Sequence, residues 1–589
     1  MQTVQQLLQE KINAALGAVG IDLSGVSPDV LAVVPCANSQ FGDYQFNGAL
    51  PLAKAHKTNP RALAQSLLEK LEVADISAPP EIAGPGFINF RLTRDFLEKA
   101  AAQVLADERL GVPLTATPRT VVVDYPSPNV AKPLHVGHVR TMFIGDAIAR
   151  LLRYAGHKVI ADDHIGDWGT PIGMVIWGWP RFGDENAFQQ NALEEMGRVY
   201  KIVKAMTGEK QDGNLTSQAK ETLASVREET AKLHQGDKEN LALWQMLRDA
   251  SQVEINEVYE QLSIKVDVTL GESFYHDRLG AIVDDLKAKN LAVESEGALI
   301  VPFQEPPHLR DKPMLVQKSD GSFLYATTDL ATIQYRMETW SPDEMVYVVG
   351  APQSDHFRQL FAAARLWGFE DASFKHISFG TVLGEDGTPL KSRTGESPKL
   401  SDLLNEAQSR ARATAKEKNA ELSEEQLDEI GRVIGIGALK YADLSQNRVS
   451  DYVFSWDKML AFQGNSAPYL LNAYVRVRSI FRRAKEQGID FDLDAPAQFH
   501  FEDAAEQELA KFILRFPLAL ATAESDYRLN AISDYLFELA GKFHSFFEEC
   551  PVLKSESPVR ESRLALCELT ARVLKQGLNL LGIETVEQM

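Results

Sequence analysis

The sequence predicts an α/β protein in three parts: an N-terminal α+β unit, a central domain built on a parallel sheet, and a C-terminal helical region. The central prediction depends on a short buried strand at 121–125, an amphipathic helix from Gly137 and another strand that begins at 158–161. A strand, a helix and a strand in this order form a parallel pair whose ligand binds at the carboxyl ends of the strands. From about residue 400 onwards the helical period dominates.

Length and composition set the broad class. The 589 residues suffice for about three or four domains of roughly 150 residues. The chain is 44% apolar and 24% charged, as in a globular protein, and no run approaches the ~18 apolar residues of a membrane span. The N-terminus is polar and lacks a signal-peptide pattern, and the first arginine is Arg61. We therefore expect a cytoplasmic protein with no membrane partner.

The charge and the cysteines narrow the possible partners and metals. A net charge of −21 argues against a nucleic-acid partner, although an Arg- and Lys-containing run at 474–485 could form a local positive patch. The three cysteines, Cys36, Cys550 and Cys567, have no paired spacing. We expect buried thiols, with neither disulfides nor a structural metal.

The N-terminal unit is predicted to span residues 1–112. A helix near 3–17 precedes a polar, glycine-containing stretch at 40–47, and an alternating pattern at 87–92 predicts a strand. A linker at 111–118 then leads to the central domain at 113–400.

Positive and polar groups gather between the first central strand and its helix. Lys132, His135 and His138 lie there with Gly137, at the predicted helix N-terminus. The backbone N–H groups and the positive dipole end of a helix favour phosphate, and these side chains can neutralise charge during phosphate transfer. Because the chain contains neither G-x-x-x-x-G-K-[ST] nor G-x-G-x-x-G, this triphosphate site is neither a Walker loop nor a dinucleotide fingerprint.

The rest of the chain continues this organisation. A charged, helical stretch at about 181–265 is predicted to be an insertion, and apolar strands resume near 299–301 and 345–349. A helical connecting segment at 401–455 and a helical domain at 456–589 follow.

One helix start in the connecting segment is well marked. Ser423 and Gln426 predict a capping box, and Leu427, Ile430 and Ile434 share one face of the helix that follows.

Several motifs together resemble one enzyme family. His135-Val136-Gly137-His138 matches the HIGH signature of class I aminoacyl-tRNA synthetases, and a lone match of this kind is weak. The resemblance narrows to arginyl-tRNA synthetases through further motifs that occur in that family's order: Ser127 to His138, Gly166-Asp167-Trp168-Gly169, Lys440 to Ser445, Trp456 to Asn465, and Leu581 to Met589. The KMSKS signature is replaced by Leu390-Lys391-Ser392-Arg393-Thr394-Gly395, which lacks the usual second lysine.

The resemblance implies an α/β Rossmann-type catalytic core with an N-terminal α+β domain that contacts the tRNA D-arm and a C-terminal all-α anticodon-binding bundle. It implies a monomeric arginine–tRNA ligase that makes arginyl-adenylate from arginine and ATP, then transfers arginine to the terminal adenosine of tRNA(Arg) and releases AMP and pyrophosphate. Mg²⁺ is expected to accompany ATP. Family members usually need tRNA for the first step, a coupling that a sequence cannot reveal.

The same resemblance assigns the catalytic residues. Because arginine's carboxylate is already ionised, adenylate formation needs positioning and charge neutralisation rather than a general base. The implied catalytic residues are Lys132, His135, His138, Lys391 and Arg393, and Lys132, His135, Gly137 and His138 are the implied ATP-binding residues. We infer that Lys132 replaces part of the charge missing from the second signature; how Lys132, Lys391 and Arg393 divide the work stays open.

Arginine selection needs a carboxylate that grips the planar guanidinium. Asp329 is the implied partner, and Tyr325 lies four residues earlier on the same predicted helix face. The full implied arginine-binding set is Asp124, Ser127, Asn129, His138, Tyr325, Asp329 and Gln353.

The implied tRNA-binding residues are Phe41, Tyr44 and Asn47 in the N-terminal domain and Tyr469 and Arg476 in the helical domain. Aromatic and arginine side chains suit stacking on unpaired bases, although a buried aromatic beside a turn is an equal alternative for each N-terminal residue.

Ordinary alternatives exist for two other features. Trp168 is as consistent with core packing as with a substrate wall, and the acidic pair before His164 is more typical of a loop than of a metal site.

Competing functions are another HxGH nucleotidyltransferase, a different class I synthetase, or a synthetase-like RNA-binding protein without catalysis. The long helical C-terminus disfavours the first. The second should show a zinc insert, an editing domain or a standard KMSKS. The third should have lost residues such as Asn129, His135 and Asp329, which are all present.

Overall fold

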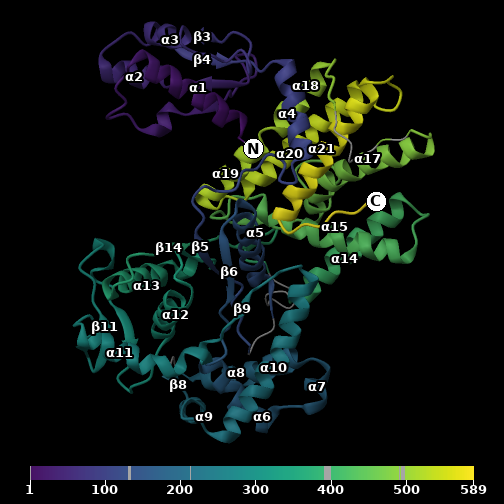
Figure 1. Cartoon of the computed structure of the whole chain (residues 1–589). Coiled ribbons are helices and arrows are strands. Elements are labelled where there is room, and N and C mark those ends of the chain that lie inside the picture. The colour runs from purple at the N-terminus through teal and green to yellow at the C-terminus, as the bar shows by residue number, and fades with distance from the viewer. Residues whose placement is uncertain (1, 131–133, 212–213, 391–398, 490, 492–497) are drawn as a thin grey trace.

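The computed structural model describes the chain except for residues 1, 131–133, 212–213, 391–398, 490 and 492–497. Figure 1 shows an N-terminal domain in purple, a central sheet with helical lobes in blue and teal, and a C-terminal helical bundle in green and yellow. The three predicted parts are therefore present in the expected order. None of the helices in the described part of the chain is long and apolar enough to cross a membrane.

The N-terminal domain packs helices on a four-stranded antiparallel sheet of order β1-β2-β4-β3. Its strands are β1 (Val33–Pro35), β2 (Tyr44–Phe46), β3 (Glu81–Ala83) and β4 (Phe87–Phe90), and its helices are α1 (Val4–Val19), α2 (Ala49–His56) and α3 (Pro60–Leu68). Thr3 and Gln6 form a capping box at the start of α1. The helix and the strand that the sequence predicted are thus confirmed as α1 and β4.

The central sheet has five parallel strands in the order β14-β13-β5-β6-β9. They are β5 (Thr120–Asp124), β6 (Lys158–Asp163), β9 (Val268–Thr269), β13 (Glu344–Tyr347) and β14 (Ser373–His376). Chain order therefore reverses between β5 and β13, and a reversal of this kind opens a crevice beyond the carboxyl ends of the strands. The predicted parallel sheet is confirmed.

Helix α5 (Val139–Ala155) connects β5 to β6 and ends at Gly156, whose φ is 100°. Helices then fill the segment between β6 and β9, beginning at Thr170, earlier than the predicted 181: α6 (Thr170–Phe182), α7 (Glu185–Gln190), α8 (Ala192–Gly208), α9 (Ser217–His234) and α10 (Lys238–Gln261). They form the lower lobe in Figure 1.

A second lobe lies between β9 and β13. The predicted strand at 299–301 belongs to a separate antiparallel sheet, β10-β11-β12, and not to the central one. Its strands are β10 (Val293–Ser295), β11 (Ala298–Val301) and β12 (Met314–Gln317), and the helices around it are α11 (Leu279–Ala288), α12 (Tyr325–Trp340) and, after β13, α13 (Ser354–Trp367).

The chain beyond residue 399 is almost wholly helical in its described part. The helices are α14 (Leu400–Lys418), α15 (Glu424–Leu444), α16 (Trp456–Met459), α17 (Ala467–Glu486), α18 (Ala504–Ile513), α19 (Phe516–Asp526), α20 (Asn530–Glu549) and α21 (Val559–Leu580). The predicted capping box of Ser423 and Gln426 starts α15, and the three residues predicted to share one face are buried.

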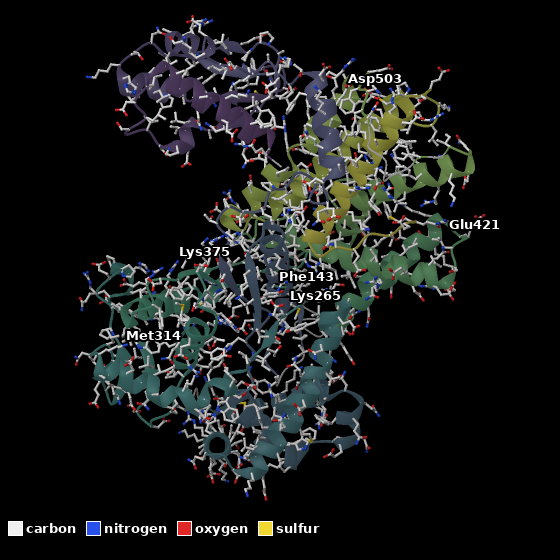
Figure 2. The ribbon with its side chains drawn as sticks, viewed as in Figure 1. Phe143, Lys265, Met314, Lys375, Glu421 and Asp503 are labelled. Carbon is white, nitrogen blue, oxygen red and sulfur yellow. The ribbon has the colours of Figure 1, made fainter. Side chains whose placement is uncertain are left out.

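Two helices tie the domains together. Helix α4 (Arg94–Ala106), which follows the N-terminal sheet, lies among the C-terminal helices in Figure 1, where Phe501 N donates to Glu98 Oε1 at 2.8 Å. Phe143 of α5 is 2% exposed, and Figure 2 places it between the central strands and the C-terminal helices. A continuous buried core therefore connects the three parts.

Candidate functional site

The two histidines of the HxGH motif lie where the chain passes from β5 into α5. His135 is extended and precedes a short 3₁₀ turn, η2 (Val136–His138), that runs into the helix. Gly137 N donates to His135 Nδ1 at 3.0 Å, and His135 N donates to His138 Nδ1 at 3.2 Å. The two rings are 4.0 Å apart. The motif therefore gathers imidazole and backbone N–H groups at a helix N-terminus, which is the arrangement that binds phosphate.

The glycine of the motif is required by close packing. A Cβ on Gly137 would lie 2.8 Å from His135 Cε1 and 2.9 Å from its Nδ1. The imidazole covers the backbone here, so any side chain would displace it.

The segment after the second signature returns to the first signature. Leu400 N donates to the carbonyl of Leu134 at 3.0 Å, and Lys399 pairs with His135 in a β-bridge. Lys132, Lys391 and Arg393 lie outside the described residues.

The end of β5 carries the first group of predicted arginine-binding residues. Ser127 Oγ donates to Asp124 Oδ1 at 2.8 Å, and Ser127 N donates to Asp163 Oδ1 at 3.0 Å. The backbone of Ser127 has a φ of 56°, a left-handed conformation that residues other than glycine rarely adopt. Burial raises the pKa of Asp163 to about 8, although Ser127 and Tyr259 donate to it. Asp163 is therefore mostly neutral near pH 7.

Asn129 lies on the same loop, against β6. Its backbone pairs with Gly166 in a parallel bridge, and Gly166 N donates to the carbonyl of Pro128 at 2.9 Å. A Cβ on Gly166 would lie 2.3 Å from Asn129 Oδ1. The glycine of the G-D-W-G motif thus leaves room for the exposed Asn129 side chain.

Asp329 occupies a partly enclosed position on α12. His356 Nε2 is 2.6 Å from Asp329 Oδ2, and His164 Nε2 is 4.0 Å from Asp329 Oδ1. The carboxylate side chain is 22% exposed. Tyr325, one helical turn earlier, is 60% exposed, and its ring meets that of His356 edge-on at 4.7 Å. The structure thus brings the two predicted residues onto one helix face, open to an incoming cation.

Glu272 is a second carboxylate in this position, which the sequence reasoning missed. It follows β9 and is close enough to Asp329 and Asp167 for both to raise its pKa. Burial is the largest cause, and the pKa of Glu272 reaches about 7 even though His164 lowers it. In the sequence, only the position of Glu272 shortly after a strand could have indicated a site residue. Strand β9 has two residues, however, and shows no pattern of its own.

Gln353 ends a 3₁₀ turn, η5 (Ala351–Gln353), directly after β13 and is exposed. The residues predicted for arginine therefore follow β5 and β13, or lie on α12, around one end of the sheet.

The predicted tRNA-contacting residues differ in exposure. Phe41 is 55% exposed, whereas Tyr44 is 3% exposed within β2, and burial raises its pKa to about 12. Asn47 is half-buried. On α17, Tyr469 OH lies 3.0 Å from His544 Nδ1, and the Arg476 guanidinium is 5.2 Å from the Phe547 ring. Phe41 is thus the N-terminal side chain of this set with its ring in solvent.

Trp168 is a packing residue. Its ring stacks on His234 at 5.2 Å and meets Trp244 edge-on at 5.2 Å, and its Nε1 donates to His276 Nδ1 at 3.0 Å. The motif Gly-Asp-Trp-Gly thereby fastens the helical insertion to the carboxyl edge of the sheet.

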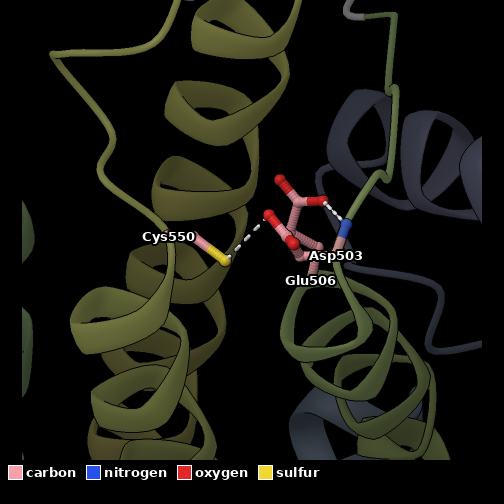
Figure 3. A group of neighbouring side chains, drawn as sticks. All are labelled: Asp503, Glu506 and Cys550. Atoms are coloured by element: carbon pink, nitrogen blue, oxygen red, sulfur yellow. Dashed lines mark hydrogen bonds between the residues drawn. The ribbon is translucent and has the colours of Figure 1, made fainter.

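Among the described residues, one group has the spacing of metal ligands: Asp503, Glu506 and Cys550, which Figure 3 shows converging between α18 and α20. Both carboxylates already pair with Arg563 at 2.6 Å. Burial raises the pKa of Cys550 to about 12, so the thiol stays protonated and is a poor ligand. This donor set does not fit a metal ion, and the cluster is structural.

Three family models together match most of the chain. "Arginyl tRNA synthetase N terminal domain" matches residues 3–92, "tRNA synthetases class I (R), catalytic domain" matches 100–456, and "DALR anticodon binding domain" matches 470–589.

Individual relatives agree with these models. Arginine–tRNA ligases of Chromobacterium violaceum and Hahella chejuensis are each 44% identical to the chain over 100% of both sequences. The crystal structure of arginyl-tRNA synthetase from Plasmodium falciparum matches with a TM-score of 0.80 at 27% identity, and the Thermus thermophilus arginyl-tRNA synthetase with 0.82 at 25%, each over 100% of both chains.

Proposed function

The chain belongs to the arginyl-tRNA synthetase family and is an arginine–tRNA ligase, and on that premise we propose which residues carry each step. In the reaction, arginine's carboxylate attacks the α-phosphate of ATP, pyrophosphate leaves, and the terminal adenosine of tRNA then takes the arginyl group and releases AMP.

ATP binds at the start of α5. Its phosphates interact with the rings of His135 and His138, which support this role by their position at the start of a helix. Mg²⁺ accompanies the phosphates. Lys132, Lys391 and Arg393 complete the positive charge, as the family resemblance implies.

Arginine binds along the carboxyl edge of the sheet. Asp329 and Glu272 accept the guanidinium, because two neighbouring carboxylates match a planar group with donors on both sides. Tyr325 covers this end. As the family resemblance implies, the ammonium and carboxylate end is bound by Asp124, Ser127, Asn129, His138 and Gln353.

The tRNA contacts both flanking domains. Phe41, with Tyr44 and Asn47 behind it, meets the D-arm, and Tyr469 and Arg476 meet the anticodon loop. The corresponding domain bounds remain those predicted: 1–112, 113–400, 401–455 and 456–589. We further propose that the enzyme acts as a monomer in the cytoplasm.

The observation that carries the arginine assignment is the Asp329 carboxylate held by His356 beside the exposed Tyr325. Asp329→Asn should raise the KM for arginine by about 100-fold, because removing a largely enclosed charge partner costs ~3 kcal/mol. KM for ATP should stay within about twofold, since the phosphate site is separate. Both constants are measured by arginine-dependent ATP–pyrophosphate exchange in the presence of tRNA.

Asp355→Asn is the matched control, since Asp355 is an exposed aspartate on the neighbouring helix α13 and pairs with Lys312 at 2.6 Å. It should leave both constants unchanged. Unaltered arginine kinetics in folded Asp329→Asn would refute the assignment.

A further inference from the structure

Arg336 joins two strands of the central sheet below the arginine site. Its Nε donates to Asp162 Oδ2 at 2.9 Å, and its Nη2 lies 2.6 Å from Asp124 Oδ2 and 2.8 Å from Asp162 Oδ2. Asp124 and Asp162 are register partners at the ends of neighbouring parallel strands, so both carboxylates face the same side. The Arg336 side chain is 0% exposed. An enclosed arginine with two carboxylate partners holds both in fixed positions.

Two carboxylates share one guanidinium, and burial, which alone would lower the pKa of Arg336, is outweighed by Asp162 and Asp124, which raise it well above its ordinary value. Asp163, the neighbouring acid, is mostly neutral near pH 7, because burial raises its pKa to about 8. Burial also raises the pKa of Asp162, although Arg336 lowers it, so Arg336 holds both carboxylates at the ends of β5 and β6, where the substrate's ammonium group is proposed to bind.

Arg336 also connects this cluster of Asp124 and Asp162 to the other end of the proposed arginine site. It follows Asp329 on α12 by seven residues, or about two helical turns, so both side chains lie on the same helix face. Helix α12 thus carries the proposed guanidinium partner and, two turns later, the residue that holds Asp124. The distance between the two ends of the bound arginine is fixed by this helix and its ion pair with the sheet.

We propose that Arg336 is a positioning residue that sets the spacing between the ammonium and guanidinium ends of the arginine site, and so makes the enzyme select its substrate by chain length. This inference rests on the proposed function, because it takes Asp124 and Asp329 as the partners of the two ends. Arg336 acts through Asp124 and does not contact the substrate.

The test is aminoacylation by the full-length enzyme with arginine and with homoarginine, which is one methylene longer. In Arg336→Lys the compact ammonium cannot reproduce the two-carboxylate geometry of the guanidinium. The KM for arginine should rise about tenfold, the KM for ATP should stay within about twofold, and the preference for arginine over homoarginine should fall at least about fivefold. A purely structural role would lower the active fraction without changing either KM or the preference.

Arg278→Lys is the matched control. Arg278 pairs at 2.7 Å with Glu338, which lies on α12 like Arg336. This pair is exposed to solvent and lies outside the proposed site. It should leave all three measurements unchanged.

A second variant guards against a folding failure of Arg336→Lys. Asp162→Asn keeps the side-chain shape and a hydrogen-bond acceptor for Arg336 but removes one of its two carboxylate partners, so the KM for arginine should rise several-fold without a change in the KM for ATP. The proposal is overturned if either variant, folded by circular dichroism, keeps the arginine KM and the homoarginine preference within about twofold of wild type. Asp329→Asn in the same series separates the two causes. If Asp329→Asn also keeps the wild-type KM for arginine, the proposed arginine site is wrong. If only Asp329→Asn raises this KM, the site stands and the proposed role of Arg336 is wrong.

Discussion

The two carboxylates proposed for the guanidinium end of the site have different surroundings. Asp329 is hydrogen-bonded to His356, whereas Glu272 is enclosed beside Asp329 and Asp167, and burial and these neighbours raise its pKa to about 7. On the proposed function, a substrate guanidinium bound beside Glu272 would stabilise the charged form of this side chain, since an opposite charge nearby favours ionisation. Arginine binding and the deprotonation of Glu272 are therefore linked.

This linkage gives a pH prediction. As the pH rises from 6 to 8 through the raised pKa of Glu272, the carboxylate ionises and the KM for arginine should fall. Glu272→Gln should raise the KM at pH 8 and remove the part of the pH dependence that Glu272 contributes. Steady-state kinetics of both proteins in the same buffers test this, and the ratio of their arginine KM values cancels titration of the histidines. An identical slope in the two proteins would show that another group controls the dependence.

The two carboxylates also show what a sequence can predict about a site. Asp329 was predicted because it lies in a family motif with Tyr325, four residues earlier, and the structure places both on one helix face. Glu272 belongs to no motif and follows a strand of two residues. Its role depends on which strand lies beside which and on how deeply the chain buries it, and neither is encoded in local spacing.

At the scale of elements, local signals predicted where helices and strands form better than which partners they have. Strand β5, helix α5 and the capping box of α15 were predicted from periodicity and caps. The apolar run at 299–301 was correctly predicted as a strand, but it pairs in a separate sheet, because alternation specifies a buried face and not a partner. The helices between β6 and β9 begin at Thr170. Their start was predicted at about 181 because the first of these helices is apolar and resembles a core segment.

One element pair gives a stability prediction. Helices α14 and α15 approach so closely at Gly435 that a Cβ there would lie 2.7 Å from the backbone of Ala407. Gly435→Ala should destabilise this helix pair by about 1–3 kcal/mol, as overpacking does. Gly541 is the matched control: it is also inside a helix, α20, and a Cβ there would have no neighbour within 4 Å, so Gly541→Ala should be neutral or stabilising by up to about 1 kcal/mol. Thermal unfolding of both variants tests this, and equal midpoints would contradict it.

At the scale of the whole molecule, one buried lysine joins three parts of the chain. Lys440 of α15 donates from Nζ to the carbonyl of Leu262, at the end of the insertion, and to that of Gly582, beyond α21, both at 2.6 Å. Asp146 of the catalytic helix α5 raises its pKa, but burial is the larger effect and lowers the pKa to about 8. The insertion, the catalytic core and the C-terminal segment thus meet at a single charge.

The lowered pKa predicts how the stability of this junction changes with pH. In the unfolded chain Lys440 holds its proton up to about pH 10.5, whereas in the folded protein it loses it near pH 8, so between these values the unfolded state binds more protons. The contribution of Lys440 to stability must therefore rise with pH across this window, because deprotonation removes a buried charge while the amine still donates to both carbonyls.

Lys440→Met cannot titrate, so the melting temperature of wild type minus that of the variant should increase from pH 7.5 to 9.5. Differential scanning calorimetry measures this difference, in which the titration of the tyrosines common to both proteins cancels. A constant or shrinking difference would mean that Lys440 stays charged in the folded enzyme, held by Asp146 as an ion pair rather than by the two carbonyls as a neutral amine.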